Sequence, residues 1–123
     1  KNSKQDAVDI DFSNLTIDHI FVEKAGNDCI DLSAGNYSLG NLFLSKCTDK
    51  ALSAGEKSNV LIESLRVIQA KVFIASKDES SVNLEDGLGL NIEKNCIDVY
   101  SKKQEFDTGT FKGENFSCEP TKF

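Results

Sequence analysis

The chain has 123 residues, which suits a single domain and is long enough to bury a core without help from disulfides or metals. Its 14 Lys and Arg residues oppose 20 Asp and Glu residues, and the net charge of −6 argues against the clustered cations of a nucleic-acid-binding surface. No apolar run approaches the ~20 residues of a membrane-spanning helix, so we expect neither a nucleic-acid partner nor a membrane span.

Pairs of apolar residues recur along the chain about every 22 residues. The first block falls at 8–10, 30–32, 52–54, 73–75 and 97–99. Two apolar residues stand two positions apart in each block, which is the period of a strand with one buried face. The column predicted to face inward is Val8, Ile30, Leu52, Phe73 and Ile97. The column predicted to face outward is Asp9, Asp31, Ser53, Ile74 and Asp98.

Two further blocks follow in every repeat with the same spacing. The second block falls at 15–17, 37–39, 60–62 and 82–84. The third falls at 20–22, 42–44, 65–67 and 88–90. The last repeat contains a longer polar stretch at 101–109, after which Phe111 and Phe116 are expected to supply the later strands.

Three short strands in each repeat, separated by corners and without room for a helix, predict an all-β fold. We expect a right-handed parallel β-helix, a single-stranded solenoid of about five coils of ~22 residues, in which stacking creates a continuous core. An antiparallel sandwich of short strands is the alternative, but it gives no reason for one period in all three blocks. Residues 1–123 are expected to form one domain, and the start at Lys1 suggests a fragment or module of a longer chain.

Asparagines recur just before the second strand of three repeats, at Asn14, Asn36 and Asn59. A stacked column of Asn side chains satisfies backbone groups at a corner, and Asn tolerates left-handed backbone angles. We therefore assign these three residues a structural role.

Four cysteines are present, and none has the spacing of a zinc site. Cys29 and Cys96 share one small inward column but lie three coils apart, about 14 Å at the spacing of paired strands, which is too far for a disulfide. Buried free thiols are the preferred interpretation, with the state of Cys47 and Cys118 left open. Free thiols fit a secreted protein poorly.

The repeats resemble those of right-handed parallel β-helix proteins. The phrases that carry the resemblance are Asn27-Asp28-Cys29-Ile30-Asp31-Leu32-Ser33, Lys50-Ala51-Leu52-Ser53-Ala54-Gly55 and Ser58-Asn59-Val60-Leu61-Ile62-Glu63. Such repeats occur in bacterial secreted and cell-surface proteins, and the same architecture houses polysaccharide lyases, glycoside hydrolases, epimerases and phage tailspikes. The resemblance implies carbohydrate as the ligand class and a secreted or cell-surface location.

Acidic residues accumulate on the outward side of the first strands. Asp6, Asp9, Asp28 and Asp31 are expected to converge on adjacent coils, where hard oxygen ligands would suit Ca²⁺. Paired carboxylates could instead cleave a glycosidic bond, with Asp9, Asp31 and Lys50 as the candidate catalytic residues. The remaining interpretation is a solvated acidic face that pairs with a column of lysines.

The outward column of the third strand is predicted to be Phe21, Phe43, Arg66 and Gly89. Two exposed Phe residues on adjacent coils could form a platform for a sugar ring or a contact with a protein partner. The alternative is cover by a terminal segment or by the loop at 101–109. Phe21, Phe43 and Arg66 are therefore the predicted ligand-binding residues.

The sequence favours a non-catalytic β-helix module that binds carbohydrate or serves as a scaffold. One alternative is the core of a polysaccharide-active lyase or hydrolase that uses the acidic face. However, the His-Gly and Arg-x-Lys motifs of galacturonan hydrolases are absent, since Ile20 follows His19 and Val67-Ile68 follows Arg66. Another alternative is an adhesion or assembly module. Partners could include polysaccharide, the rest of a parent chain, or further copies joined through solenoid ends that residues 1–5 are too short to cap.

Overall fold

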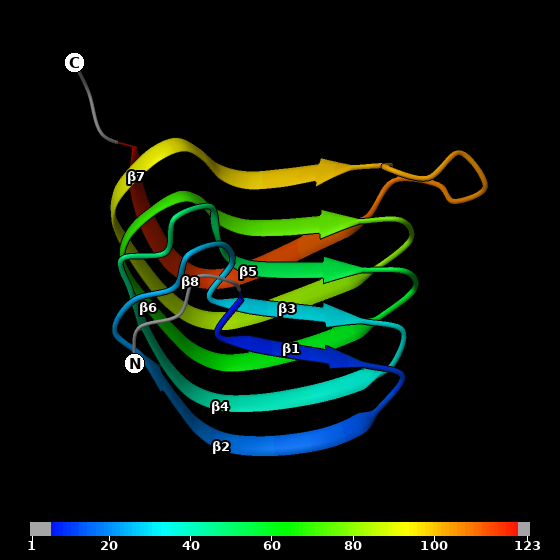
Figure 1. The fold of residues 1–123 in the computed structure, drawn as a ribbon, viewed down its shortest axis with the longest axis horizontal. Helices are drawn as coiled ribbons and strands as arrows, with labels where there is room; N and C mark the ends of the chain where they lie inside the picture. The colour runs from blue at the N-terminus through cyan, green and yellow to red at the C-terminus, as the bar shows by residue number, and fades with distance from the viewer. Residues whose placement is uncertain (1–5, 121–123) are drawn as a thin grey trace.

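The computed structural model describes residues 6–120 and contains only β-strands, turns and loops in that range. The strands are β1 (Val8–Asp11), β2 (Asn14–Val22), β3 (Ile30–Ser33), β4 (Asn36–Ser45), β5 (Lys50–Gly55), β6 (Asn59–Lys77), β7 (Ser81–Tyr100) and β8 (Thr110–Pro120). Every strand pairing is parallel. Figure 1 shows the chain winding in stacked coils, with β1, β3 and β5 in one row and β2 and β4 running along the opposite side. The all-β parallel solenoid predicted from the repeat is confirmed.

The pairing of strands follows the sequence repeat from coil to coil. Val8 in β1 pairs with Ile30 in β3, and Ile30 pairs with Leu52 in β5. Asn14 in β2 likewise pairs with Asn36 in β4. Each inward side chain therefore lies on its equivalent in the next coil, and the blocks at 8–62 are aligned as predicted.

The predicted alignment is wrong by one residue in the second half of β6. Leu52 pairs with Ile74 rather than with Phe73, so Ile74 faces the core and Ala75 takes the outward position. The observed step from Leu52 to Ile74 keeps the 22-residue period, whereas the prediction shortened it by one to place Phe73 inward. At the corner before this segment, the N–H groups of Lys71 and Val72 both donate to the carbonyl oxygen of Asp49. The observed inward column is Val8, Ile30, Leu52, Ile74 and Ile97.

A second one-residue error concerns the third block of β7. Leu88 rather than Gly89 pairs with Arg66, so Gly87 and Gly89 replace large inward residues. The ring of the fully buried Phe73 fills this space, since a Cβ atom added to Gly89 would lie 2.8 Å from Phe73 Cδ1. The large side chain on β6 thus fills the space that the two glycines of β7 leave in the core.

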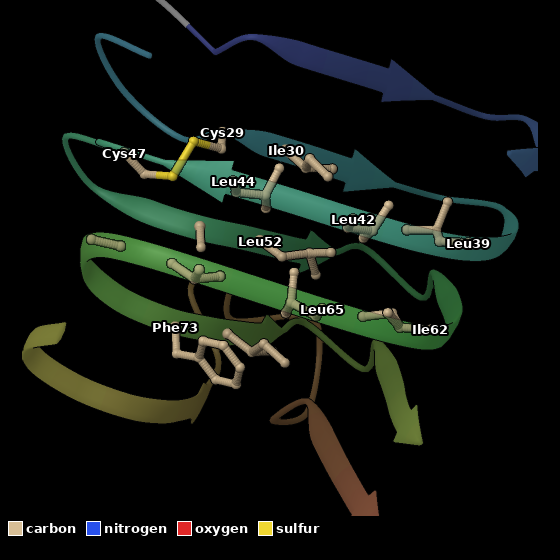
Figure 2. Packing of buried hydrophobic residues seen from close by; sticks show 14 of the residues in the cluster. Cys29, Ile30, Leu39, Leu42, Leu44, Cys47, Leu52, Ile62, Leu65 and Phe73 are labelled. Carbon is tan, nitrogen blue, oxygen red and sulfur yellow. A yellow bond between two sulfur atoms is a disulfide. The ribbon is translucent and has the colours of Figure 1, made fainter. Parts of the chain in front are cut away.

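Two disulfides correct the prediction of free thiols. Cys29 is bonded to Cys47 and Cys96 to Cys118, with Cα–Cα distances of 5.4 and 6.0 Å. Each bond joins the start of a coil to the end of the same coil, because the chain returns to the same corner after one circuit. Cys29 and Cys96 are not bonded to each other, as their separation predicts, and each finds its partner within its own coil. Figure 2 shows the Cys29–Cys47 bond beside core residues that include Ile30, Leu44 and Leu52.

The polar stretch at 101–109 forms a loop between β7 and β8, coloured orange in Figure 1. Buried Asp78 anchors it, because its Oδ1 accepts hydrogen bonds from the backbone N–H of Lys102 (2.7 Å) and Lys103 (2.9 Å). Phe111 and Phe116 lie in β8, as predicted, and pair with Val82 and Gly87 of β7.

The described strands end at β1 and β2 on one side and at β8 on the other. Residues 1–5 and 121–123, on which the prediction of uncapped ends partly rests, lie outside the described residues. Within residues 6–120 no helix is long and apolar enough to cross a membrane.

Candidate functional site

The third-strand surface brings the predicted ligand-binding residues together. Phe21 in β2 pairs with Phe43 in β4, and Phe43 pairs with Arg66 in β6. The two rings are stacked, with centroids 5.4 Å apart and planes inclined by 10°. Phe21 is 62% exposed, so the described residues leave most of its ring open to solvent.

Polar residues at the adjoining corner lie beside the stacked rings. His19 pairs with Asn41, and Asn41 pairs with Ser64, one rung above another. Together with Phe21, Phe43 and Arg66 they line an open depression of about 250 Å³. We call these six residues the aromatic face. The face combines a flat apolar surface with an imidazole, an amide, a hydroxyl and a guanidinium group, so it can both stack against a ring and exchange hydrogen bonds with it.

The loop at 101–109 does not cover the aromatic face. Its Lys103 is paired with Glu56, and its Phe106 ring lies 5.8 Å from the ammonium group of Lys57. Both contacts lie at the corner that follows β5, away from Phe21. Cover by this loop was one of the predicted alternatives, and for the described residues it is wrong.

Three of the four predicted metal ligands converge on the first-strand surface. Asp6, Asp28 and Asp31 each place a carboxylate oxygen within 4.8 Å of the others, and we call them the acidic cluster. Asp9 pairs with Asp31 on the neighbouring rung but is not a member of this group. The structure thus brings three of these four carboxylates together, as the spacing of the repeat predicts.

Backbone hydrogen bonds hold two of these carboxylates in place. Asp28 N–H donates to Asp6 Oδ1 (2.9 Å), and Lys50 N–H donates to Asp28 Oδ1 (3.1 Å). Each Asp thus receives the corner N–H of the next coil, which explains why an Asp recurs at this position. The Lys50 ammonium lies 2.9 Å from Asp49 Oδ2 and 4.0 Å from Asp28 Oδ1.

Burial changes the protonation of Asp28 and Asp31 in the acidic cluster. Burial raises the pKa of Asp31 to about 7, helped by a hydrogen bond with Asp6 and by the charges of Asp28 and Asp6, while the charge of Lys77 opposes the shift. Burial also raises the pKa of Asp28, although Lys50 opposes the shift. Desolvation, followed by the charges of Asp11 and Asp6, raises the pKa of Asp9.

Lys50, a predicted catalytic candidate, is held in its charged form. Burial by itself would lower its pKa, but the hydrogen bond to Asp49 and the nearby charge of Asp28 raise the pKa above the ordinary value. A lysine serves as a general base only when its pKa is lowered toward neutrality. Lys50 is therefore suited to pairing with carboxylates rather than to proton abstraction.

The asparagine column is present, and it also borders a groove that the sequence did not indicate. Asn36 Nδ2 donates to Asn14 Oδ1, and Asn59 Nδ2 donates to Asn36 Oδ1, both at 3.0 Å. With Tyr37, Leu61 and other neighbours the column lines an open groove of about 480 Å³. The left-handed backbone angles expected at these asparagines occur elsewhere, at the residues that turn the corners.

The sequence pattern did not identify Asp49, which forms an ion pair with Lys50, or Asp78, which anchors the 101–109 loop. Asp78 occupies the corner position of Phe12, Ala34 and Glu56, and because Glu56 is also acidic, the sequence carries no signal that Asp78 is buried.

Comparison with known proteins assigns this chain to no family, so it is classified by its fold. The chain matches no protein-family model, and searches of curated proteins and of solved structures also gave no match. The strand pairing defines the class, a parallel β-solenoid protein with two disulfides and two distinct polar surfaces.

Proposed function

We propose that this chain is a non-catalytic β-solenoid module that binds carbohydrate through the aromatic face, on a secreted or cell-surface protein of the bacterial β-helix type. The observation that carries the proposal is the stacked and exposed pair Phe21–Phe43 with Arg66 on the next rung. The apolar C–H face of a sugar packs on an aromatic ring, and its hydroxyl groups accept and donate hydrogen bonds at the ring's polar border.

The chemistry of the face favours a neutral or weakly charged saccharide. Arg66 and Asn41 supply donors, and Asn41 and Ser64 supply acceptors for hydroxyl groups. The chain as a whole carries a charge of −6, which disfavours polyuronates over neutral glycans. The depression is shallow and open, so it suits one or two residues of a longer chain rather than an enclosed small molecule.

The two disulfides support an extracellular location. Disulfides form and persist in oxidising compartments and are rare in the cytosol. Each one closes a coil of this chain, so the fold uses bonds that a reducing compartment would remove. The argument from free thiols against secretion therefore no longer applies.

Glycan-array screening followed by calorimetry tests the proposal. We expect at least one neutral oligosaccharide to bind, and Phe21→Ala to weaken that binding by about tenfold through loss of ring stacking. Phe12→Ala is the matched control, because Phe12 is also exposed (79%) but lies at the corner between β1 and β2.

Two results would overturn the assignment. One is the absence of any glycan binding by the wild-type chain, and the other is equal weakening by Phe12→Ala. A wild-type dimer in size-exclusion chromatography that Phe21→Ala dissociates would favour the adhesion or assembly alternative instead.

A further inference from the structure

A buried hydroxyl group on the first-strand surface has no hydrogen-bond partner. Ser53 in β5 is 0% exposed, and its Oγ atom contacts no donor or acceptor among the described residues. Burying an unpaired hydroxyl costs about 1–3 kcal/mol, so such groups are rare in a packed structure. Ser58 Oγ at the corner after β5 is the other one among the described residues, and Ser53 is the one that stands beside a group of carboxylates.

The position of Ser53 connects it to the acidic cluster. Ser53 pairs with Asp31 of β3, and paired residues of adjacent parallel strands place their side chains on the same side of the sheet. Both side chains therefore lie on the outward surface, one rung apart. The unpartnered hydroxyl is directed to the same side as the carboxylates of Asp6, Asp28 and Asp31.

The acidic cluster carries more negative charge than its neighbours neutralise. Two ammonium groups act on these carboxylates. Lys50 lies 2.9 Å from Asp49 and 4.0 Å from Asp28, and the charge of Lys77 opposes the rise in the pKa of Asp31. Asp31 forms no salt bridge within the described residues. A cation placed among the three carboxylates would be attracted by their negative charges.

We propose that Asp6, Asp28 and Asp31, together with the hydroxyl of Ser53, bind a divalent cation of the Ca²⁺ type. Carboxylate and hydroxyl oxygens are hard ligands, and the group contains no His or Cys to favour zinc or copper. Oxygens on opposite sides of a Ca²⁺ ion lie about 4.6–5.2 Å apart, which accommodates the observed limit of 4.8 Å. Mg²⁺ demands a nearly ideal octahedral shell and usually keeps several of its waters, so it suits an irregular set of protein oxygens less well than Ca²⁺ does.

The ion would join successive coils of the solenoid. Asp6 precedes β1, and Asp28 precedes β3. Asp31 lies in β3 and Ser53 in β5. Binding to this set therefore links the first-strand row across three neighbouring strands. Such a site stabilises the folded state by mass action, since the ligands come together only when the coils are stacked.

Calorimetric titration of the complete, disulfide-bonded chain with CaCl₂ tests this inference, after removal of divalent ions with EDTA. We expect one bound ion per chain and a rise in melting temperature with Ca²⁺ that NaCl of equal ionic strength does not produce. MgCl₂ should bind more weakly. Asp31→Asn should weaken Ca²⁺ binding by about tenfold or more, because it removes a ligand charge while the Asn amide can still donate a hydrogen bond to Asp6.

Asp98→Asn is the matched control, since Asp98 occupies the same outward column but lies outside the acidic cluster. Ser53→Ala removes only the unpartnered hydroxyl, so it should fold normally and weaken Ca²⁺ binding by several-fold, even if Asp31→Asn fails to fold. A wild-type chain that binds no Ca²⁺ at about 10 mM would overturn the inference. Equal Ca²⁺ affinity of Ser53→Ala, Asp31→Asn and Asp98→Asn would also overturn it.

Discussion

Single residues with left-handed backbone angles turn the solenoid at a repeated corner. Phe12, Ala34, Glu56 and Asp78 have φ values of 51°, 46°, 45° and 51°, and they stand one repeat apart. None is a glycine, although glycine adopts this conformation at the lowest cost. The corner therefore stores strain that the pairing of the flanking strands maintains.

Ala34→Gly should relieve this strain. Left-handed backbone costs a residue with a Cβ atom roughly 1–2 kcal/mol, and the greater unfolded-state entropy of glycine offsets part of the gain. We expect the free energy of unfolding to rise by about 0.5–1 kcal/mol, measured by urea denaturation. Ala75→Gly is the control, because Ala75 has no positive φ and should lose about 1 kcal/mol. Destabilisation of both variants would contradict the argument.

The candidate residues were predictable wherever one column of the repeat determined them. Phe21, Phe43 and Arg66 needed only the third-strand spacing, and the structure places them on consecutive rungs. The partner of a cysteine was not predictable in this way. The Cys29–Cys47 bond depends on how far the chain travels around one coil, which the column pattern does not contain.

At the scale of the strand, a large core side chain on one strand is compensated by small residues on the neighbouring strand. Phe73 stands in a column that otherwise holds Ala51 and Cys96, and its ring occupies the space beside Gly87 and Gly89 of β7. The sequence pattern assigned Leu88 and Leu90 inward because apolar residues usually mark the buried face. Only the three-dimensional fit shows that two glycines face the core to admit one aromatic ring.

Gly89→Ala should therefore destabilise the protein through a clash with Phe73. The added Cβ atom would lie 2.8 Å from Phe73 Cδ1, and overpacking of this kind costs about 1–3 kcal/mol. Phe73→Leu alone should also destabilise, since it leaves a cavity. The double variant should lose less than the sum of the two losses, as measured by urea unfolding in a double-mutant cycle. Additive losses would show that the two residues do not share this space.

At the scale of the whole molecule, each coil contacts only its neighbours, so stability is distributed along the stack. The repeat predicted this architecture because its period and its i, i+2 pairs are properties of the chain itself. The one-residue errors at Phe73 and Leu88 arose where large apolar residues were placed inward against the period, since Leu52 and Ile74, like Arg66 and Leu88, stand 22 residues apart. In such a stack, local stability is approximately the sum of each coil and its interfaces.

The Cys96–Cys118 disulfide should then protect the last coil rather than the whole fold. β8 pairs only with β7, and its Phe116 ring lies 6.4 Å from that of Phe73. Without the disulfide, β8 depends on this one ladder and on those side-chain contacts, so it should open separately from the rest. In Cys96→Ala/Cys118→Ala we expect amide hydrogen exchange to accelerate in β8, while β4 keeps its protection.

Removal of Cys29 and Cys47 should instead accelerate exchange in β4, because β4 lies between β2 and β6 and its corner holds that bond. Equal acceleration across all strands in both variants would mean that the solenoid unfolds as one cooperative unit, and the nearest-neighbour description of its stability would be wrong.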